Sequence, residues 1–294
     1  MQFLPRREIL TLEEIADTAQ AFTSLGVDKI RITGGEPLVR RNVLWLFEKL
    51  GTLALRELVL TTNGSRLSQF AAPLREYGVS RINISLDSLQ PDRFKRITRV
   101  GNLNKVLSGI DAALHAGFKR LKINSVIMKN RNHDEVPELV QFAIDRDMDI
   151  SFIEEMPLGA IDDHSRREAY YSSDELINDL GLHYDLIPTS ISTGGPSRYY
   201  RIQGTGTHVG LISPHSRNFC SSCNRVRLTA QGRLLLCLGQ EHSVDLRRVA
   251  RNHPHDPDML QQEIKRAMQI KPWGHEFNLD EQPVILRHMS VTGG

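Results

Sequence analysis

Cysteine is scarce in this chain: three occur among 294 residues, and all three lie between residues 220 and 237. No run of about 18 apolar residues is present, so we expect no membrane-spanning helix. The basic pair Arg6-Arg7 is not followed by an apolar core, so we expect no secretory signal. These absences, with so few cysteines, predict a protein of the reducing cytoplasm.

The charge balance and the length set further limits. Lys and Arg total 37 and Asp and Glu total 35, a net charge of +2 that does not indicate broad affinity for nucleic acid. No internal repeat or low-complexity tract is present. A chain of 294 residues can bury a full core, as one large domain or as one domain with a smaller appendage.

The first half of the chain alternates short β-branched runs with segments of helical period. Five runs predict strands: 29–33, 58–62, 82–86, 121–127 and 150–154. Helical periodicity covers 12–25, 43–50 and 103–116, and Thr11 with Glu14 predicts a capping box for the first of these. Such alternation requires a parallel sheet with crossover helices, either a barrel or a doubly wound sheet.

Polar residues gather at the end of every predicted strand. The five groups are Gly34-Gly35-Glu36-Pro37, Thr61-Thr62-Asn63-Gly64, Ser85-Leu86-Asp87-Ser88, Asn124-Ser125 and Glu154-Glu155-Met156. Each group alone has an ordinary explanation as a turn or a helix cap. Five groups at the carboxyl ends of parallel strands would lie on one rim, which is where barrel enzymes assemble their sites.

The pattern changes after residue 156. A charged loop at 162–167 is followed by a helix start at Ser173, and a stretch rich in Gly, Ser, Thr and Pro contains a predicted strand at 199–202. Helical periodicity returns over 245–269. We therefore predict a barrel-like part over 1–156 and a C-terminal part over 157–294.

The three cysteines predict a metal site. Cys220 and Cys223 are two residues apart and so converge on one ion, and Cys237 returns after a short stretch that contains Gly232. Buried structural thiols would not need that turn. A disulfide is disfavoured because nothing marks secretion and an odd number leaves one thiol over.

The identity of the metal stays open on local spacing alone. His215 or His242 could complete a Cys3His zinc site, since structural zinc takes four protein ligands. Three thiolates could instead hold a [4Fe–4S] cluster with one open iron, which suits a substrate bound through nitrogen or oxygen. The neighbouring Arg225 and Arg227 favour the cluster, because guanidinium groups match phosphate oxygens, although they could equally form a solvated basic edge.

Taken together, these motifs resemble a known family. The strand-end groups resemble the radical S-adenosylmethionine (SAM) enzymes. With Cys220-x-x-Cys223-Asn224-Arg225-x-Arg227, Cys237-Leu238 and the terminal Gly293-Gly294, the chain resembles the GTP 3′,8-cyclase family from Leu10 to Gly294. That resemblance implies an incomplete (β/α)6 TIM-like barrel with a C-terminal extension that carries a second Fe–S site.

One family feature is not found in this sequence. Radical SAM enzymes hold their catalytic cluster with Cys-x-x-x-Cys-x-x-Cys after the first barrel strand, and no such motif occurs here. We therefore expect five of the six barrel strands, with the first one missing. We also expect that the chain as given does not turn over, because SAM cleavage needs the N-terminal [4Fe–4S] cluster.

The resemblance also assigns residues to ligands. It implies SAM contacts at Gly35, Ser85 and Met156. It implies GTP contacts at Arg31, Thr61, Lys122, Arg225, Val226 and Arg227, and a [4Fe–4S] cluster at Cys220, Cys223 and Cys237 whose open iron binds guanine. Arg31 and Lys122 lie inside predicted strands, where a cation must be paired inside the barrel or extend outward to solvent. The Gly293-Gly294 tail would reach into the active site.

The implied activity is the first step of molybdenum cofactor biosynthesis, a lyase reaction that joins C3′ of the GTP ribose to C8 of guanine. Implied partners are an electron donor and, as the next enzyme, cyclic pyranopterin monophosphate synthase, and the resemblance allows a homodimer. Three alternatives stay open: a non-catalytic paralogue that binds GTP and one cluster, a radical SAM relative with a peptide substrate, and a zinc-stabilised domain.

Overall fold

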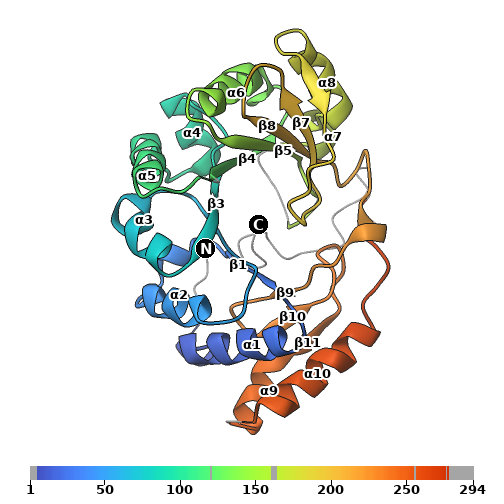
Figure 1. The fold of residues 1–294 in the computed structure, drawn as a ribbon. Helices are drawn as coiled ribbons and strands as arrows, with labels where there is room; N and C mark the ends of the chain where they lie inside the picture. Colours follow the sequence, from blue (N-terminus) through green and yellow to red (C-terminus); the bar gives the residue numbers. More distant parts are fainter. Residues whose placement is uncertain (1–4, 120, 160–163, 255, 276, 278–294) are drawn as a thin grey trace.

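The computed structural model describes residues 5–277, apart from residues 120, 160–163, 255 and 276. Its main feature is an eight-stranded sheet that curves around the middle of the molecule, with helices on its outer side (Figure 1). The order across the sheet is β1-β2-β3-β4-β5-β8-β7-β6. The strands are Lys29–Ile32 (β1), Glu57–Thr62 (β2), Val79–Ser85 (β3), Leu121–Ile127 (β4), Asp149–Glu154 (β5), Leu186–Pro188 (β6), Arg198–Ile202 (β7) and His208–Ile212 (β8).

The parallel sheet predicted from the sequence is confirmed, but it contains one more parallel strand than expected. β1 to β5 are parallel neighbours, and β8 pairs in parallel with β5. β7 and β6 then continue the sheet in antiparallel pairs. The expectation of five parallel strands was therefore wrong, because no strand was predicted over the residues of β8.

Gly210 interrupts the apolar run of β8 in the sequence, and the close approach of neighbouring side chains explains why a glycine lies there. A Cβ at Gly210 would lie 2.3 Å from the Ser197 hydroxyl and 2.5 Å from the Ser151 hydroxyl. A larger residue at this position would force these side chains to shift. A glycine inside a short apolar run weakens the strand signal in the sequence while serving the packing of the folded sheet.

The helices follow the crossover pattern of a parallel α/β fold. They are Leu12–Ser24 (α1), Val43–Gly51 (α2), Leu67–Glu76 (α3), Pro91–Thr98 (α4), Leu103–His115 (α5), Val136–Ile144 (α6), Arg166–Ala169 (α7), Ser173–Gly181 (α8), Leu246–Asn252 (α9) and Pro257–Gln269 (α10). The predicted capping box is confirmed: the Glu14 backbone N–H donates to the Thr11 hydroxyl, and Glu14 accepts from the Thr11 N–H at 2.8 Å. Short 3-10 turns include Pro37–Val39 (η2) and Cys220–Ser222 (η4).

The alternation of side chains along the strands separates an apolar core from a polar inner face. Leu58, Leu60, Ile82, Ile84 and Ile123 are almost completely buried in the cluster between the sheet and its helices. The intervening residues of the same strands point to the opposite face, since successive strand side chains alternate. That inner face carries Arg31, Thr61 and Lys122, three of the six predicted GTP contacts.

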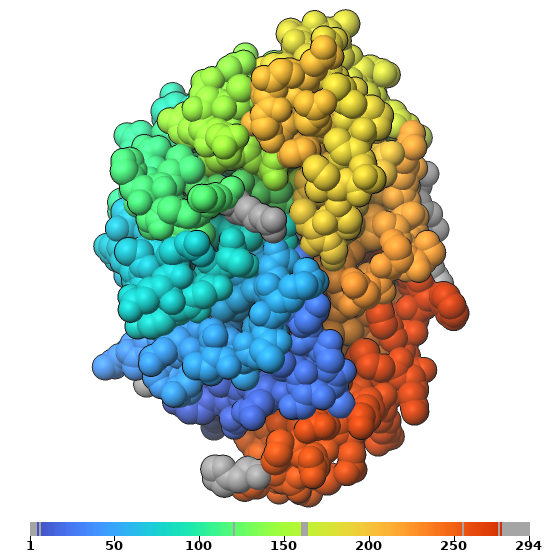
Figure 2. Space-filling model, in the orientation of Figure 1, coloured from blue at the N-terminus to red at the C-terminus, as the bar shows by residue number. Residues whose placement is uncertain are grey.

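A second, smaller core joins the C-terminal segment to α1. The strands Arg227–Leu228 (β9), Arg233–Leu235 (β10) and Ser243–Asp245 (β11) form an antiparallel sheet. Ala21 of α1 is buried with Leu234, Leu246 and Ile264. Arg251 of α9 donates to the Glu14 carboxylate at 2.6 Å, and Figure 2 shows the C-terminal helices against the N-terminal segment.

The division of the chain at residue 156 stays a prediction. The large sheet itself continues beyond that residue through β8, β7 and β6. Among the described residues, no helix combines the length and the apolar character that spanning a membrane requires.

Candidate functional site

A row of polar side chains crosses the inner face of the sheet at one level. The ladder pairs Thr61 of β2 with Asn83 of β3, and Asn83 with Lys122 of β4. From β1, the Arg31 guanidinium donates to the Thr61 hydroxyl at 3.4 Å. Three of the predicted GTP contacts therefore lie close together around Asn83.

Lys122 is a buried cation that forms no ion pair with a carboxylate within the described part of the chain. Its ammonium donates to the Tyr199 hydroxyl at 3.2 Å and lies 5.7 Å from the centre of that ring. Burial lowers the pKa of Lys122; Tyr199 opposes this shift, and the charges of Arg31 and Arg81 add to it. A buried cation in such a position is expected to bind an anion.

Electrostatic interactions between Arg31 in this row and Arg225 and Arg227 in the cysteine segment connect the two parts of the site. Burial lowers the pKa of Arg31 to about 10, and the positive charges of Arg81 and Arg225 contribute to the shift. Burial lowers the pKa of Arg227 to about 10 as well, assisted by Arg225 and Arg31 and opposed by Cys223. Arg31, Arg225 and Arg227 thus repel one another across the two parts of the chain, and an anion between them would relieve that repulsion.

An ion-paired group lies at the amino-terminal ends of the first strands. The Glu57 carboxylate contacts the Lys29 ammonium at 2.7 Å and the Arg81 guanidinium at 2.9 Å. One carboxylate between two cations leaves the group with net positive charge. Sequence reasoning missed these residues. Lys29 begins a predicted run, and Glu57 and Arg81 directly precede theirs, so charged side chains at the start of β-branched runs were a usable signal.

Val226 differs from the other predicted GTP contacts. Its side chain packs against the smaller core rather than facing the basic row. The side chains that the structure brings together are therefore those of Arg31, Thr61, Lys122, Arg225 and Arg227.

The predicted SAM contacts follow parallel strands and so share one edge of the sheet. Gly35 follows β1, Ser85 ends β3, and Met156 follows β5. Gly35 and Ser85 are exposed, and Met156 is half-buried. Gly34 has φ +148°, a conformation that disfavours larger residues.

Glu36 fixes the Gly-Gly-Glu-Pro turn to the loop after β2. Its carboxylate accepts from the Leu38 N–H at 3.0 Å, the Thr62 hydroxyl at 2.8 Å and the Asn63 N–H at 2.7 Å. A carboxylate that accepts several hydrogen bonds holds its loops rigidly. Two of the polar groups predicted for the rim are thereby tied together.

Asp87, from the third rim group, has an altered acidity. Burial raises the pKa of its carboxyl to about 6, and the Val126 N–H and the Ser125 hydroxyl oppose the shift. The Val126 N–H donates to Asp87 Oδ1 at 2.8 Å.

We expect the stability difference between an Asp87→Asn variant and the parent to depend on pH. Because the folded chain raises this pKa, the carboxyl contributes stability fully below about pH 4, and that contribution is lost as pH rises through 6. Asn mimics the protonated acid, so the variant should gain about 1 kcal/mol on the parent between pH 5 and pH 7.5. Urea unfolding of iron-free protein at both pH values measures this; an unchanged difference would show that Asp87 titrates as in the unfolded chain.

Glu154, at the end of β5, anchors the segment that leads to the cysteines. It is buried, and its carboxylate accepts from the backbone N–H groups of Ser173 at 2.9 Å, His215 at 3.0 Å and Ser216 at 3.1 Å. The Ser216 hydroxyl also donates to it. The barrel rim and the loop before Cys220 are thus joined by one side chain.

Glu154→Gln should therefore destabilise the fold. The amide replaces an acceptor oxygen with an N–H group that faces other N–H donors, which costs about 1–3 kcal/mol of unfolding free energy. Urea denaturation measures the loss. The matched control is Glu168→Gln on the exposed side of α7, which should stay within about 0.5 kcal/mol of the parent. An equal loss of unfolding free energy in the two variants would show that Glu154 does not anchor the segment.

The three cysteines are half-buried free thiols. The Cys223 N–H donates to the Cys220 carbonyl at 3.0 Å across η4, while Cys237 follows β10. Burial raises the pKa of Cys223, but the N–H and charge of Arg225, together with Lys271, outweigh it and hold the pKa below its usual value. This donor set has the thiolate chemistry of an Fe–S or zinc ligand.

The structure does not bring the sulfurs together as a finished metal site. Across the described part of the chain, no three His, Cys, Asp or Glu side chains are grouped to hold a metal ion. His215 is engaged elsewhere, since its Nε2 lies 2.9 Å from the Glu155 carbonyl and its ring contacts Tyr170. His242 is exposed. Neither histidine is positioned as a fourth ligand.

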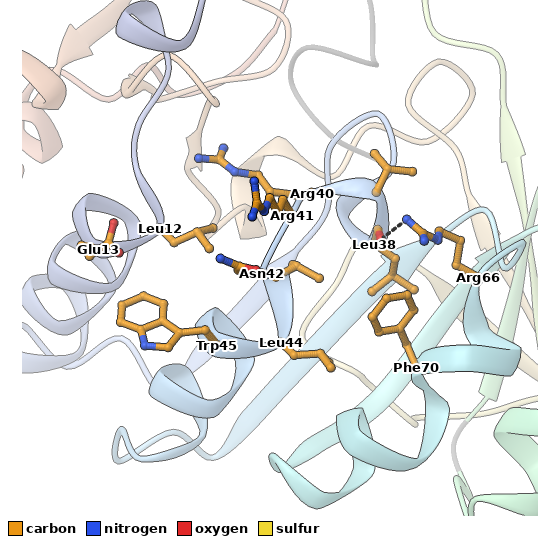
Figure 3. Close-up of a pocket in the computed structure, with 12 residues that line it drawn as sticks. Leu12, Glu13, Leu38, Arg40, Arg41, Asn42, Leu44, Trp45, Arg66 and Phe70 are labelled. Carbon is orange, nitrogen blue, oxygen red and sulfur yellow. Dashed lines mark hydrogen bonds between the residues drawn. The ribbon is translucent and has the colours of Figure 1, made fainter.

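A pocket of about 600 Å³ lies outside the sheet, next to the Gly-Gly-Glu-Pro turn (Figure 3). Its lining includes Leu12, Leu38, Arg40, Trp45, Arg66 and Phe70. The Arg40 guanidinium donates to the Leu10 carbonyl, and that of Arg66 donates to the Leu38 carbonyl at 3.1 Å. The residues that line this pocket include none of the predicted site residues, and the buried Lys122 lies on the inner face instead. The predicted tail contact of Gly293-Gly294 falls outside the described residues.

Comparisons with known proteins agree with the fold. Residues 2–143 match the Radical SAM superfamily, and residues 148–277 match the family Molybdenum Cofactor Synthesis C. The fold resembles that of Streptococcus suis SuiB, with a TM-score of 0.60 at 15% identity over 88% of this chain and 61% of that one. SuiB bound to S-adenosylmethionine gives 0.59 at 14% identity, over 87% and 61%. These matches and the parallel α/β sheet define a radical SAM protein.

Closer relatives specify the family. The chain is 56% identical to the GTP 3′,8-cyclases of Saccharophagus degradans, Pseudomonas syringae pv. syringae and Marinobacter nauticus, over 100% of its length and 89% of theirs. The chain belongs to the GTP 3′,8-cyclase family.

Proposed function

We propose that this chain binds GTP as the substrate of a GTP 3′,8-cyclase reaction, the first step of molybdenum cofactor biosynthesis. The observation that carries the proposal is the set of cations Arg31, Lys122, Arg225 and Arg227, of which Lys122 is buried and the three arginines are half-buried. A nucleoside triphosphate supplies the several anionic oxygens that such a set requires.

We further propose that Cys220, Cys223 and Cys237 hold a [4Fe–4S] cluster whose open iron takes the guanine, and that SAM binds at Gly35, Ser85 and Met156. Radical chemistry at SAM would also need the N-terminal [4Fe–4S] cluster, whose Cys-x-x-x-Cys-x-x-Cys motif does not occur in this sequence. Supplied with that cluster, SAM would provide the radical that removes a hydrogen atom from the ribose C3′ before C3′ is joined to C8. The half-buried thiols and the lowered pKa of Cys223 support the cluster. The shared edge of β1, β3 and β5 supports the SAM site.

The protein itself would hold and orient the substrate. Lys122 and Arg31 would bind phosphate oxygens on the inner face, where low polarity strengthens the attraction. Arg225 and Arg227 would hold the nucleotide between that face and the cysteines, so that ribose and base keep a fixed geometry. The electron donor, the next enzyme of the pathway, a homodimer and the division at residue 156 stay predictions.

Affinity should fall stepwise from GTP to GDP to GMP, because each lost phosphate removes oxygens from the cationic set. Each step should cost about tenfold or more, since a charge-assisted hydrogen bond contributes about 1.5–3 kcal/mol. Equilibrium titration of anaerobically reconstituted protein measures this, with ATP as a control for base selection. Equal affinity for GTP and GMP would contradict the proposed orientation, and no binding of GTP would overturn the function.

A further inference from the structure

The side chain of Asn83 on β3 is the most conspicuous unsatisfied group of the inner face. It is completely buried, with 0% of its surface exposed. Neither its amide nitrogen nor its amide oxygen has a hydrogen-bond partner among the described residues. A buried polar atom without a partner costs about 1–3 kcal/mol, and folded proteins rarely keep such groups without a functional reason.

The position of Asn83 connects it to the proposed nucleotide site. It is the direct ladder neighbour of Thr61 on one side and of Lys122 on the other. Adjacent strands lie about 4.8 Å apart, so a ligand group held by Lys122 is within reach of the amide. Neither neighbour forms a hydrogen bond with the amide; Lys122 donates to Tyr199, and Thr61 accepts from Arg31.

The donors and the acceptor of the Asn83 amide indicate which kind of ligand group it can bind. Asn offers two N–H donors and one carbonyl acceptor. A phosphate oxygen at neutral pH accepts but does not donate, so it would leave the Asn83 carbonyl oxygen unsatisfied. A hydroxyl group accepts and donates at once and therefore satisfies both ends of the amide.

We propose that Asn83 binds a ribose hydroxyl of the nucleotide and fixes the ribose relative to the phosphates held by Lys122. This inference rests on the proposed function, because it takes a nucleoside triphosphate as the ligand. Asn83 is then a specificity residue for ribose, beside cations that select for phosphate.

The test compares nucleotides that differ by one hydroxyl. The reconstituted chain is titrated with GTP, 2′-deoxy-GTP and 3′-deoxy-GTP, and GMP serves as the phosphate control. In the parent, at least one deoxynucleotide should bind about ten- to a hundredfold more weakly than GTP, because the amide is left unpaired. In Asn83→Leu this ratio should fall to about one, while the ratio of GTP to GMP affinity is retained.

A second variant guards against a folding defect. Asn83→Ser removes bulk without adding an apolar group, and it should also lose hydroxyl discrimination. The same substitution at Asn102, which caps α5 away from the inner face, should leave every ratio unchanged.

The titrations distinguish a failure of the role proposed for Asn83 from a failure of the proposed GTP binding. A parent that binds all three triphosphates equally would overturn the role of Asn83, and so would variants that keep the discrimination. A uniform loss of affinity for every nucleotide in the Asn83 variants would assign Asn83 to the fold alone. A parent that does not bind GTP would instead overturn the proposed function.

Discussion

Replacing Cys220, Cys223 or Cys237 by Ser, one at a time, is expected to reduce bound iron from about four atoms per chain to nearly none. The three thiols are the only cysteines of the chain, so none can substitute for another. Serine keeps the size of the side chain but has no thiolate. Anaerobic reconstitution with iron and sulfide, followed by iron analysis and absorption spectra before and after dithionite, measures the effect.

The controls separate the cluster from a zinc site. Ser222→Ala, within the same 3-10 turn, should load iron fully. His215→Ala and His242→Ala should also load fully, because the structure positions neither histidine with the thiols. Full iron content in any one cysteine variant would remove that residue from the site. A colourless parent that holds one zinc would favour the Cys3His alternative.

Arg227→Ala and Arg225→Ala are expected to weaken GTP binding about ten- to a hundredfold without loss of iron. Arg227 is the sharper probe, since Arg225 also contacts the Cys223 sulfur at 3.8 Å and lies over the Phe219 ring. Removing Arg227 takes away one of the positive charges that interact with Arg31. The loss should be larger for GTP than for GMP.

Arg233→Ala is the matched control for that experiment. Arg233 lies in the same segment on β10, but its guanidinium donates to the Ser243 hydroxyl at 2.8 Å and contacts the Asp245 carboxylate at 3.7 Å. Its replacement should leave GTP affinity within about twofold of the parent. If the Arg225 and Arg227 variants bind GTP as the parent does, these arginines are a basic edge and the substrate assignment loses its main support.

Five strands and their parallel arrangement could be predicted because β-branched runs alternate with helical periods. β8 could not be predicted in this way. Its Gly210 lies where side chains from β5 and from the segment before β7 approach closely, and that approach exists only in the folded sheet. The same limit applies to the inner face. Alternation separates two faces of a strand, but it does not say that Asn83 meets Thr61 and Lys122 at one level.

The cysteine segment shows a different limit. Spacing and residue type predicted a metal site, and the half-buried thiols beside Arg225 are compatible with it. The sulfurs are nevertheless not grouped as ligands among the described residues. Metal binding energy commonly assembles its own ligand set, so neither sequence spacing nor the fold of the chain alone fixes that geometry.

The most direct measurement of the central claim is the electron paramagnetic resonance spectrum of the dithionite-reduced, reconstituted chain during a GTP titration. A cluster held by three thiolates with one open iron should change its spectrum as GTP binds, and the change should saturate at the affinity found by equilibrium titration. Adding inorganic triphosphate, which lacks the base, should leave the spectrum unchanged. A cluster spectrum that GTP does not alter, although GTP binds, would contradict the claim that the cysteine site and the nucleotide site are one.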